Sequence, residues 1–203
     1  MVQINWSGYL WDVFNGSWGS NTFSDSTNNV WIDTNNNLHL KITNINNIWR
    51  CAEIDSVNQM GYGTYIINLI SNPITVIGND NRTVIGLFYY LDDYNELDIE
   101  YSKWQVQSNN NLGQYTVQDH PPIESPAFPI NIGNTSNKIV WHSNGNVDFE
   151  VKDLSSNNII NAWTYSGGYQ TSLGGLYAIN LWLVGGSPTT DGLEKEIILS
   201  SSL

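Results

Sequence analysis

Apolar and polar residues alternate along most of this chain, with a repeat of two residues. In residues 38–42 every second position is apolar, and a polar turn separates this run from residues 30–33. Residues 139–142 and 147–151 flank an Asn-Gly turn in the same way. Period-two runs joined by short turns rich in Asn and Gly predict antiparallel β-hairpins.

The rest of the chain extends this pattern. No ten-residue stretch has the apolar period of 3.6 that an amphipathic helix needs. Residues 83–90 are apolar almost throughout, which predicts a strand buried on both faces. Four prolines between residues 120 and 129 predict a loop. Further runs typical of strands are 49–55, 63–70, 114–118, 177–184 and 194–199. Roughly a dozen strands without a repeat or a linker predict one all-β antiparallel sandwich domain over residues 1–203.

One strand-like stretch carries its acidic residues on a single face. Glu96, Asp98 and Glu100 alternate with Leu97 and Ile99, so the three carboxyl groups point one way and the two apolar side chains the other. Like charges along a sheet face repel each other and do nothing for the fold. Two carboxyl groups acting together can cleave a glycosidic bond. The alternatives are a solvated acidic edge strand and a calcium site.

Aromatic residues flank this acidic face. Tyr94 and Trp104 have the same parity as the carboxylates, and rings beside carboxylates suit a groove that stacks on sugar faces. For Trp104, sugar stacking and core packing are equally good interpretations. The nine Trp and eleven Tyr residues of the chain fit both a sandwich core and a sugar-binding groove.

The charge balance restricts the class of partner. The net charge is −12 with only seven Lys and Arg residues, which argues against nucleic acid and anionic membranes as partners. The sequence contains no run of 18 or more apolar residues, so it predicts no transmembrane helix. A neutral polysaccharide is compatible with this composition, and we expect a monomer. The first residues show no signal peptide.

Other candidate chemistry is weak. The single cysteine, Cys51, cannot form an intrachain disulfide, and with no activating His near it in the sequence we expect a structural role. His39, His120 and His142 lack the spacing of zinc ligands. We expect each histidine to be structural.

Three motifs in order along the chain resemble glycoside hydrolase family 16, and within it the bacterial lichenases, which are β-1,3-1,4-glucanases. The first is Glu96-Leu97-Asp98-Ile99-Glu100, in the ungapped form that lichenases and xyloglucan-active relatives have. The second is the run 51–56 followed by 61–65, and the third is Asn180-Leu181-Trp182. With their surroundings the matches cover most of the chain.

The resemblance implies a β-jelly-roll of two curved antiparallel sheets with a concave cleft. It gives Glu96 the place of the nucleophile, Glu100 that of the acid/base, and Asp98 that of a hydrogen-bond partner of the nucleophile. Sugar contacts that it implies are at Glu53, Trp182, Tyr94 (where lichenases carry a Trp) and Asn21. Gln118 and Thr116 are further candidates, from a strand expected beside the acidic one.

The resemblance also implies an activity, namely endo-acting hydrolysis of β-glucan (β-1,3-1,4 or β-1,3) by a retaining double displacement. Three neighbouring carboxyl groups cannot all ionise easily, so one pKa should rise, and we expect this at Glu100. A non-catalytic, lectin-like jelly roll and a transglycosylase acting on xyloglucan-type polymers remain alternatives. No cofactor is required, a structural calcium ion with Glu196 as a ligand stays open, and the family implies an extracellular protein.

Two positions depart from the lichenase pattern. Asp55 stands where lichenases have an Arg that contacts sugar, which increases the negative charge expected in the cleft. Phe23 falls near the place of a cysteine that would pair with Cys51. Packing is therefore expected to replace that disulfide.

Overall fold

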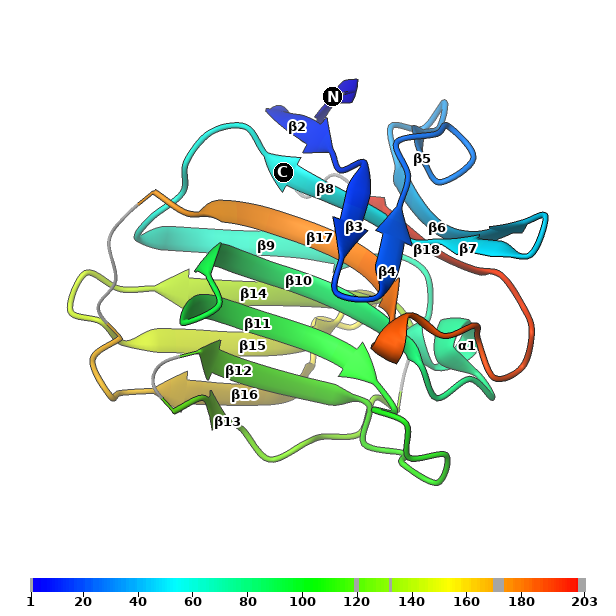
Figure 1. The fold of residues 1–203 in the computed structure, drawn as a ribbon. Coiled ribbons are helices and arrows are strands. Elements are labelled where there is room, and N and C mark those ends of the chain that lie inside the picture. Colours follow the sequence, from blue (N-terminus) through cyan, green and yellow to red (C-terminus); the bar gives the residue numbers. More distant parts are fainter. Residues whose placement is uncertain (1, 119–120, 132, 170–173, 201–203) are drawn as a thin grey trace.

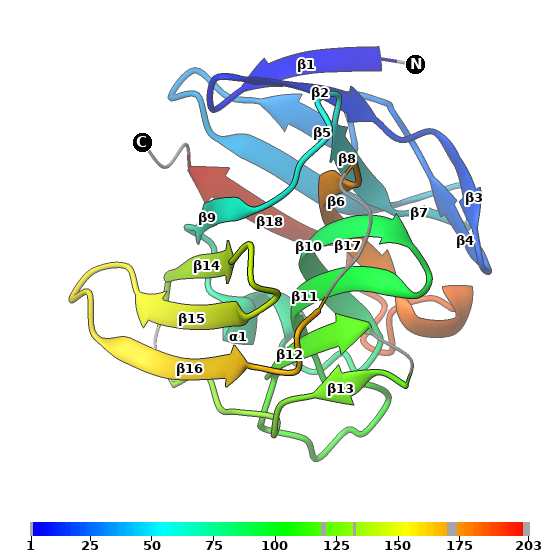
Figure 2. The same cartoon turned by 90° about the vertical axis from the view of Figure 1, so that its left-hand side faces the viewer.

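The computed structural model describes residues 2–118, 121–131, 133–169 and 174–200. Two large antiparallel sheets face each other as the layers of a jelly-roll sandwich (Figures 1 and 2). The first sheet has the strand order β1 (Val2–Trp6), β2 (Tyr9–Val13), β8 (Ala52–Ser56), β17 (Leu176–Leu183), β10 (Thr83–Asp92), β11 (Asn95–Ser102), β12 (Gly113–Gln118) and β13 (Ile123–Glu124). The expected all-β jelly roll is confirmed.

The second sheet lies behind the first in Figure 1. Its order is β16 (Ile159–Tyr165), β15 (Val147–Asp153), β14 (Thr135–Trp141), β9 (Gly63–Leu69), β18 (Lys195–Ser200), β6 (Leu38–Ile45) and β5 (Val30–Ile32), with β7 (Ile48–Arg50) also paired to β6. A separate hairpin of β3 (Gly16–Trp18) and β4 (Asn21–Phe23) crosses in front of the first sheet (Figure 1). The two short helical segments are α1 (Pro73–Ile77) and the 3₁₀ turn η1 (Val184–Gly186).

Strand alternation separates the core from the site. On β11 the side chains of Leu97, Ile99 and Tyr101 are fully buried between the sheets, so the residues between them point to the outer face of the first sheet. Tyr115 on β12 is also fully buried and stacks on Phe149 of the second sheet at 5.1 Å between ring centroids. Much of the aromatic content is therefore core.

Several sequence expectations need correction. The structure contains α1, which the polar and apolar pattern did not reveal because five residues are too few for a helical period to appear. The proline segment is not all loop, since β13 pairs with β12 along it. On β10, Phe88 and Tyr90 are only partly buried, so this strand is not covered on both faces. Strands β1 to β4 and β16 had no counterpart in the expectation.

The expected strand over residues 49–55 is two strands in different sheets. The chain leaves β7, beside β6 in the second sheet, and enters β8 in the first sheet at Cys51. The Cys51 backbone bonds to β4, with its N–H donating to the Thr22 oxygen at 2.8 Å. Cys51 is 1% exposed, and burial raises the pKa of its thiol to about 12. Phe23, also buried, lies opposite Cys51 in this bridge, as expected where packing replaces a disulfide.

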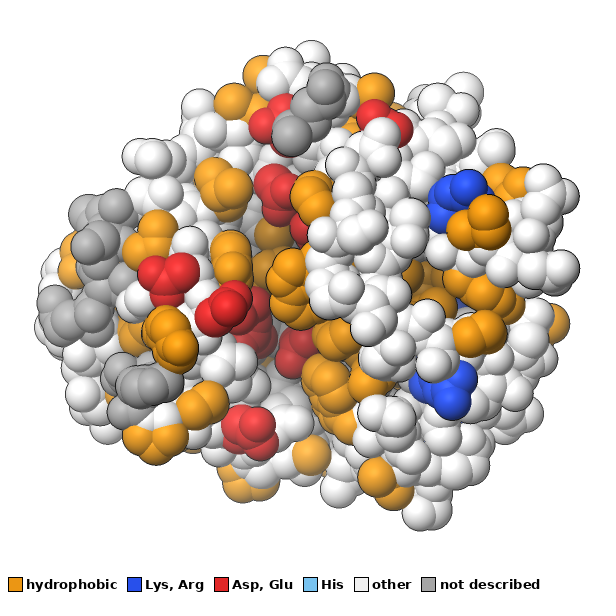
Figure 3. All heavy atoms as spheres, in the orientation of Figure 1, with side chains coloured by type: hydrophobic (Ala, Val, Ile, Leu, Met, Phe, Trp, Pro, Cys, Tyr) orange, Lys and Arg blue, Asp and Glu red, His pale blue; other side chains and the backbone are white. Residues whose placement is uncertain are grey.

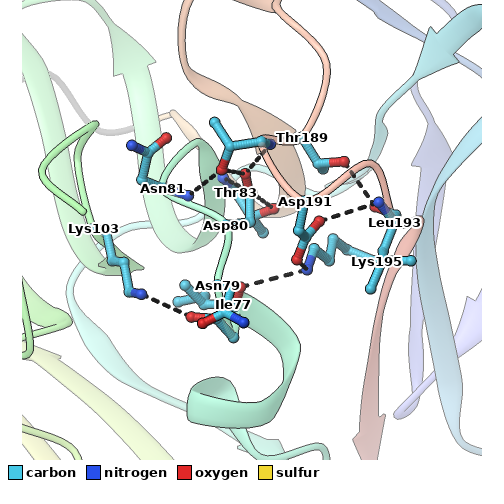
Figure 4. A network of polar contacts seen from close by, with 12 residues as sticks. Ile77, Asn79, Asp80, Asn81, Thr83, Lys103, Thr189, Asp191, Leu193 and Lys195 are labelled. Carbon is cyan, nitrogen blue, oxygen red and sulfur yellow. Dashed lines mark hydrogen bonds and ion pairs between the residues drawn. The ribbon is translucent and has the colours of Figure 1, made fainter. Parts of the chain in front are cut away.

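A buried carboxylate ties two segments of the chain together at one end of the sandwich (Figure 4). Asp80 is fully buried and accepts hydrogen bonds from the backbone N–H and hydroxyl of Thr83 and from those of Thr190, the two backbone contacts being 2.6 Å each. Nearby, Lys195 pairs with Asp191 at 2.7 Å. The network fixes the start of β10 against the segment before β18.

None of the helices in the described part of the chain is long and apolar enough to cross a bilayer.

His39 contacts Glu196 at 2.8 Å and stacks on Trp31, and His142 contacts Asp148 at 2.7 Å. Both contacts fit structural roles. His120 lies outside the described residues.

Candidate active site

The acidic residues of β11 lie on the outer face of the first sheet, in one cavity of about 300 Å³. Glu96, Asp98 and Glu100 all line this cavity. They do so because strand alternation buries Leu97 and Ile99 in the core, which leaves the three carboxyl groups on the opposite face. The arrangement is the one that the sequence pattern predicts.

The strand register adds acidic residues from a distant part of the chain. Glu100 lies opposite Gly86, Gly86 opposite Asn180, and Asn180 opposite Glu53. A second row joins Asp98 to Asp55 in the same way, through Phe88 and Ala178. With Asp93 at the β10–β11 turn, six carboxyl side chains line the cavity.

Aromatic side chains form the apolar part of the wall. Trp182 on β17 contacts Trp18 of the β3–β4 hairpin edge-on, at 5.7 Å between ring centroids. Trp18 is 53% exposed, so its outer face is available to a ligand. Phe14, Phe88 and Tyr90 complete this wall. Rings beside carboxyl groups suit a sugar, which presents apolar faces and polar edges. Figure 3 shows acidic and apolar side chains gathered in the hollow beside the hairpin.

Glycine at position 86 makes room for Asn180. A Cβ atom at residue 86 would stand 2.4 Å from Asn180 Oδ1, far inside van der Waals contact. Asn180 Nδ2 donates to Glu53 Oε2 at 3.0 Å. The absent side chain at residue 86 therefore leaves room for the Asn180 amide between Gly86 and Glu53.

Burial keeps part of the carboxyl cluster protonated near neutral pH. Burial raises the pKa of Glu96 to about 7, with a lowering by the hydrogen bond from Asp98 and a further rise from the charge of Asp93. Burial, then the charges of Glu96 and Glu124, raises the pKa of Glu100 to about 8. The pKa of Asp98 is raised well above its usual range by burial and by the charges of its two acidic neighbours, Glu96 and Glu100. The three groups titrate together as one coupled set, with Glu96 more acidic than Glu100.

The other side of the cavity is electrostatically similar. Burial, then the charge of Asp55, raises the pKa of Glu53 to about 8, although the hydrogen bond from Asn180 works in the opposite direction. Burial, then the charge of Asp12, raises the pKa of Asp55 to about 6. No positive side chain among the described residues lowers the pKa values of these carboxyl groups.

The structure brings some of the other expected sugar contacts to the cavity. Glu53 and Trp182 line it. Trp104 does not line it but packs on Trp182 at 6.2 Å between ring centroids. Gln118 and Thr116 pair with Glu96 and Asp98 respectively across β11 and β12. They therefore lie beside the cavity on the carboxylate side.

Two expected contacts are placed elsewhere. Tyr94 is 60% exposed in the turn that precedes β11, and strand parity does not govern a turn residue. The Asn21 side chain is buried and fully engaged, since Nδ2 donates to the Leu183 oxygen at 3.0 Å and Oδ1 accepts from Cys51 Sγ at 3.3 Å. Neither residue lines the cavity. We therefore leave Tyr94 and Asn21 out of the candidate site.

Several residues that line the cavity are not predicted by the sequence, for a different reason in each case. The third motif contains Asn180, but nothing in it distinguishes Asn180 as a contact. Phe88 and Tyr90 lie in a strand that seemed buried on both sides. Trp18 comes from a hairpin too short to show a pattern. Strand register, which sequence does not show, brings these residues together.

The expected calcium ligand is engaged in another contact. Glu196 Oε1 contacts His39 Nδ1 at 2.8 Å, and His39 Nε2 lies 3.4 Å from Asp33. Among the described residues no three His, Cys, Asp or Glu side chains converge to hold a metal ion. A structural calcium ion at Glu196 therefore stays a prediction.

Comparison with solved structures shows which known proteins share this fold. No family model and no curated protein sequence matches the chain. Among solved structures it is similar to the β-glucanase of Bacillus licheniformis, with 18% identity, a TM-score of 0.65 and coverage of 98% of this chain and 95% of that one. The immunostimulatory antigen and pseudo β-1,3-glucanase Rv0315 of Mycobacterium tuberculosis has 17% identity and a TM-score of 0.68, covering 93% and 88%.

A prokaryotic β-1,3-1,4-glucanase (lichenase) from a mouse hindgut metagenome has 14% identity and a TM-score of 0.61, and the match covers 95% of this chain and 93% of that one. These identities are low, so the likeness concerns the arrangement of the backbone. The chain has the lichenase-like jelly-roll fold of the β-glucanases of glycoside hydrolase family 16.

Proposed function

We propose that the protein is a retaining endo-β-glucanase, with Glu96 as nucleophile and Glu100 as general acid and base. The observation that carries the proposal is the alignment of three carboxyl groups on one face of β11, in a cavity walled by tryptophans. Its likeness in fold to β-glucanases supports a polysaccharide substrate. The chemistry requires no cofactor.

In the first step the Glu96 carboxylate attacks the anomeric carbon of the sugar. The bond between this carbon and the glycosidic oxygen breaks, and Glu100 gives its proton to that oxygen, so that the leaving sugar departs as an alcohol. A glycosyl ester on Glu96 remains. The lower pKa of Glu96 fits the ionised role and the higher pKa of Glu100 fits the protonated role.

In the second step water attacks the same carbon. The Glu100 carboxylate takes the proton of the water, the ester bond breaks, and Glu96 is released as a carboxylate. Asp98, which shares a hydrogen bond with Glu96, holds that carboxyl group in place and stabilises its charge. A sugar hydroxyl that replaces water in this step would give transglycosylation.

The test is reducing-end release from lichenan, laminarin and xyloglucan, with and without oligosaccharide acceptors. We expect hydrolysis of at least one β-glucan, with loss of about a thousandfold or more in kcat for Glu96→Gln and Glu100→Gln. Asp148→Asn, a carboxylate on the other sheet, serves as the control. Proton NMR of the first product should show the β-anomer.

Two outcomes would reject the proposal. If both Glu→Gln variants kept the parent rate, the assigned residues would be wrong. If the parent protein bound β-glucan oligosaccharides but released no reducing ends, the protein would be a carbohydrate-binding jelly roll. This second reading is worth testing because the similar Rv0315 protein is described as a pseudo β-1,3-glucanase.

A further inference from the structure

Trp104 has a backbone conformation that bulky residues rarely adopt. Its φ angle is 50°, and Gln105, which follows it, has a φ angle of 63°. Both values lie in the left-handed region, where the Cβ atom crowds a neighbouring carbonyl oxygen, so a tryptophan there is strained. Strained residues persist where the surrounding structure fixes them, and they gather at functional sites.

The turn that carries Trp104 is fixed on both sides of this residue. Before it, the buried Lys103 donates to the Gly78 oxygen at 2.7 Å (Figure 4). After it, the Gln105 N–H donates to the Asn81 oxygen at 2.7 Å. These hydrogen bonds join the turn to the segment between α1 and β10, and so they maintain the left-handed backbone at Trp104.

The indole of Trp104 gains no hydrogen bond from this position. The residue is partly buried, and its Nε1 atom is shielded from solvent and has no hydrogen-bond partner among the described residues. A buried donor without an acceptor is unfavourable, so the backbone and the N–H of Trp104 both lower the stability of the fold. What the ring gains is a contact with the cavity wall. It packs edge-on against Trp182, with 6.2 Å between ring centroids and 67° between the planes, which is a favourable geometry for an aromatic pair.

Two tryptophans contact Trp182, and they are attached to the protein in different ways. Trp18 is 53% exposed and projects from a hairpin with three residues in each strand. Trp104 is partly buried and projects from the turn that Lys103 and Gln105 fix. Trp104 is therefore the more firmly anchored of the two rings beside Trp182.

We propose that Trp104 is a positioning residue, which holds the Trp182 indole in the orientation that stacks on the bound sugar. The inference rests on the proposed function and adds to it a residue outside the cavity. Trp182 lies on β17 two residues from Asn180, whose row across the sheet ends at Glu100. A shift of this indole would therefore change where the neighbouring sugar lies relative to Glu100. An indole that is held in place before binding also loses less conformational freedom when the sugar binds.

The experiment measures sugar binding and the mobility of Trp182 in parallel. Trp104→Ala, in the Glu100→Gln background that prevents cleavage, is titrated by calorimetry with laminarihexaose and with a mixed-linked β-1,3-1,4-glucose hexasaccharide. We expect binding about fivefold weaker than that of Glu100→Gln alone. Nitrogen-15 relaxation of the indole N–H groups should show the order parameter of Trp182 falling below about 0.6, which is typical of a flexible group. The Trp182 signal is identified by its loss in Trp182→Phe, and the signal of the buried Trp6 should stay unchanged.

Further variants in the same background separate positioning from a purely structural role. In Trp182→Ala, the added Trp104→Ala change should cause no further loss of affinity, because its effect passes through Trp182. Trp104→Gly relieves the strained backbone, so it should unfold at a higher urea concentration than Trp104→Ala and yet bind the sugar equally weakly. Trp104→Phe keeps a ring and removes the unpaired N–H, so its affinity should stay within about twofold of the background. As the control, Trp31→Ala removes a partly buried ring that stacks on His39 of the other sheet, and it should leave the affinity unaltered.

Three outcomes would overturn the inference. The first is an unchanged order parameter of Trp182 in Trp104→Ala. The second is a more mobile Trp182 with unaltered affinity for a hexasaccharide that the background protein binds. The third is a loss of affinity from Trp104→Ala that is as large in Trp182→Ala as in the background.

The result can be separated from that of the proposed function. If the Glu100→Gln protein binds neither hexasaccharide, the proposed function fails, and the order parameter of Trp182 alone decides whether Trp104 positions it. If the parent protein cleaves β-glucan but Trp104→Ala changes neither the affinity nor the order parameter, only the present inference fails.

Discussion

At the scale of single residues, the environments of Glu96 and Glu100 set the pH at which the site can work. Burial raises both pKa values, to about 7 for Glu96 and about 8 for Glu100. The mechanism needs Glu96 ionised and Glu100 protonated in the free enzyme. Glu124 is an exposed residue whose carboxylate accepts a hydrogen bond from Gln114 at 2.9 Å, and its charge contributes to the raised pKa of Glu100.

We therefore expect kcat/KM to follow a bell-shaped pH profile with its maximum between about pH 7 and 8. Glu124→Gln removes a negative charge that disfavours the ionised form of Glu100, so its alkaline limb should move to lower pH. The acidic limb should change less. An unchanged alkaline limb, measured on β-glucan at low ionic strength, would mean that Glu100 is not the group responsible.

At the scale of elements, the β3–β4 hairpin carries the exposed side of the aromatic wall. It has only three residues in each strand and is attached to the body through the Cys51 bridge and the contact of Asn21 with Leu183. Trp18 projects from it against Trp182. The hairpin therefore acts as a small support that holds one ring over the cleft.

Trp18→Ala should weaken substrate binding without unfolding the protein. The ring is about half exposed, so we expect KM on β-glucan to rise about tenfold while the free energy of unfolding falls by less than about 1 kcal/mol. Trp6→Ala offers a contrast, because Trp6 is buried and does not line the cavity, so its loss should affect stability instead. A Trp18→Ala protein with the parent KM would exclude Trp18 from the site.

At the scale of the whole molecule, the carboxyl groups of Asp80 and Glu53 make the stability of the fold depend on pH in opposite directions. Burial alone would raise the pKa of Asp80, but hydrogen bonds from Thr83 and Thr190 outweigh it and the pKa is lowered. This group stabilises the fold at neutral pH and ceases to do so as the pH falls through its native pKa. Glu53 has a raised pKa, so its contribution is complete below the pKa of the unfolded chain and is lost as the pH rises toward 8.

Asp80→Ala should lower the free energy of unfolding by about 3 kcal/mol, because it leaves the buried donors of Thr83 and the more exposed donors of Thr190 without their acceptor. Urea unfolding at pH 7 measures this. Asp148→Ala removes an exposed carboxylate and should cost under about 1 kcal/mol. If the two variants lost the same stability, the network in Figure 4 would not join the loops as described.

Glu53→Gln should make the protein less sensitive to alkaline pH. The parent should lose stability between pH 5 and 8.5 as the raised carboxyl groups of the cleft ionise in the folded state. The variant cannot ionise at residue 53, so its unfolding midpoint in urea should fall less over the same range. A parallel pair of curves would show that Glu53 is ionised in the folded protein throughout.

The sequence alone determined the class of fold and the heart of the candidate site. Both follow from alternation along a strand, which is local covalent geometry. The parity that puts Glu96, Asp98 and Glu100 on one face needs only that residues 95–102 form a strand, and they do. Beyond the ends of that strand parity has no meaning, so it does not place Tyr94, in the turn before the strand, or Trp104, after its end.

Only the tertiary structure decided which other residues meet Glu100. Its row runs through Gly86 and Asn180 to Glu53. The pairs Gly86–Asn180 and Asn180–Glu53 join strands that lie far apart in the sequence. Register between such strands is fixed by how two whole apolar faces fit together in the core, which no local pattern encodes. The raised pKa values have the same origin, because burial of a carboxyl group depends on the elements packed around it.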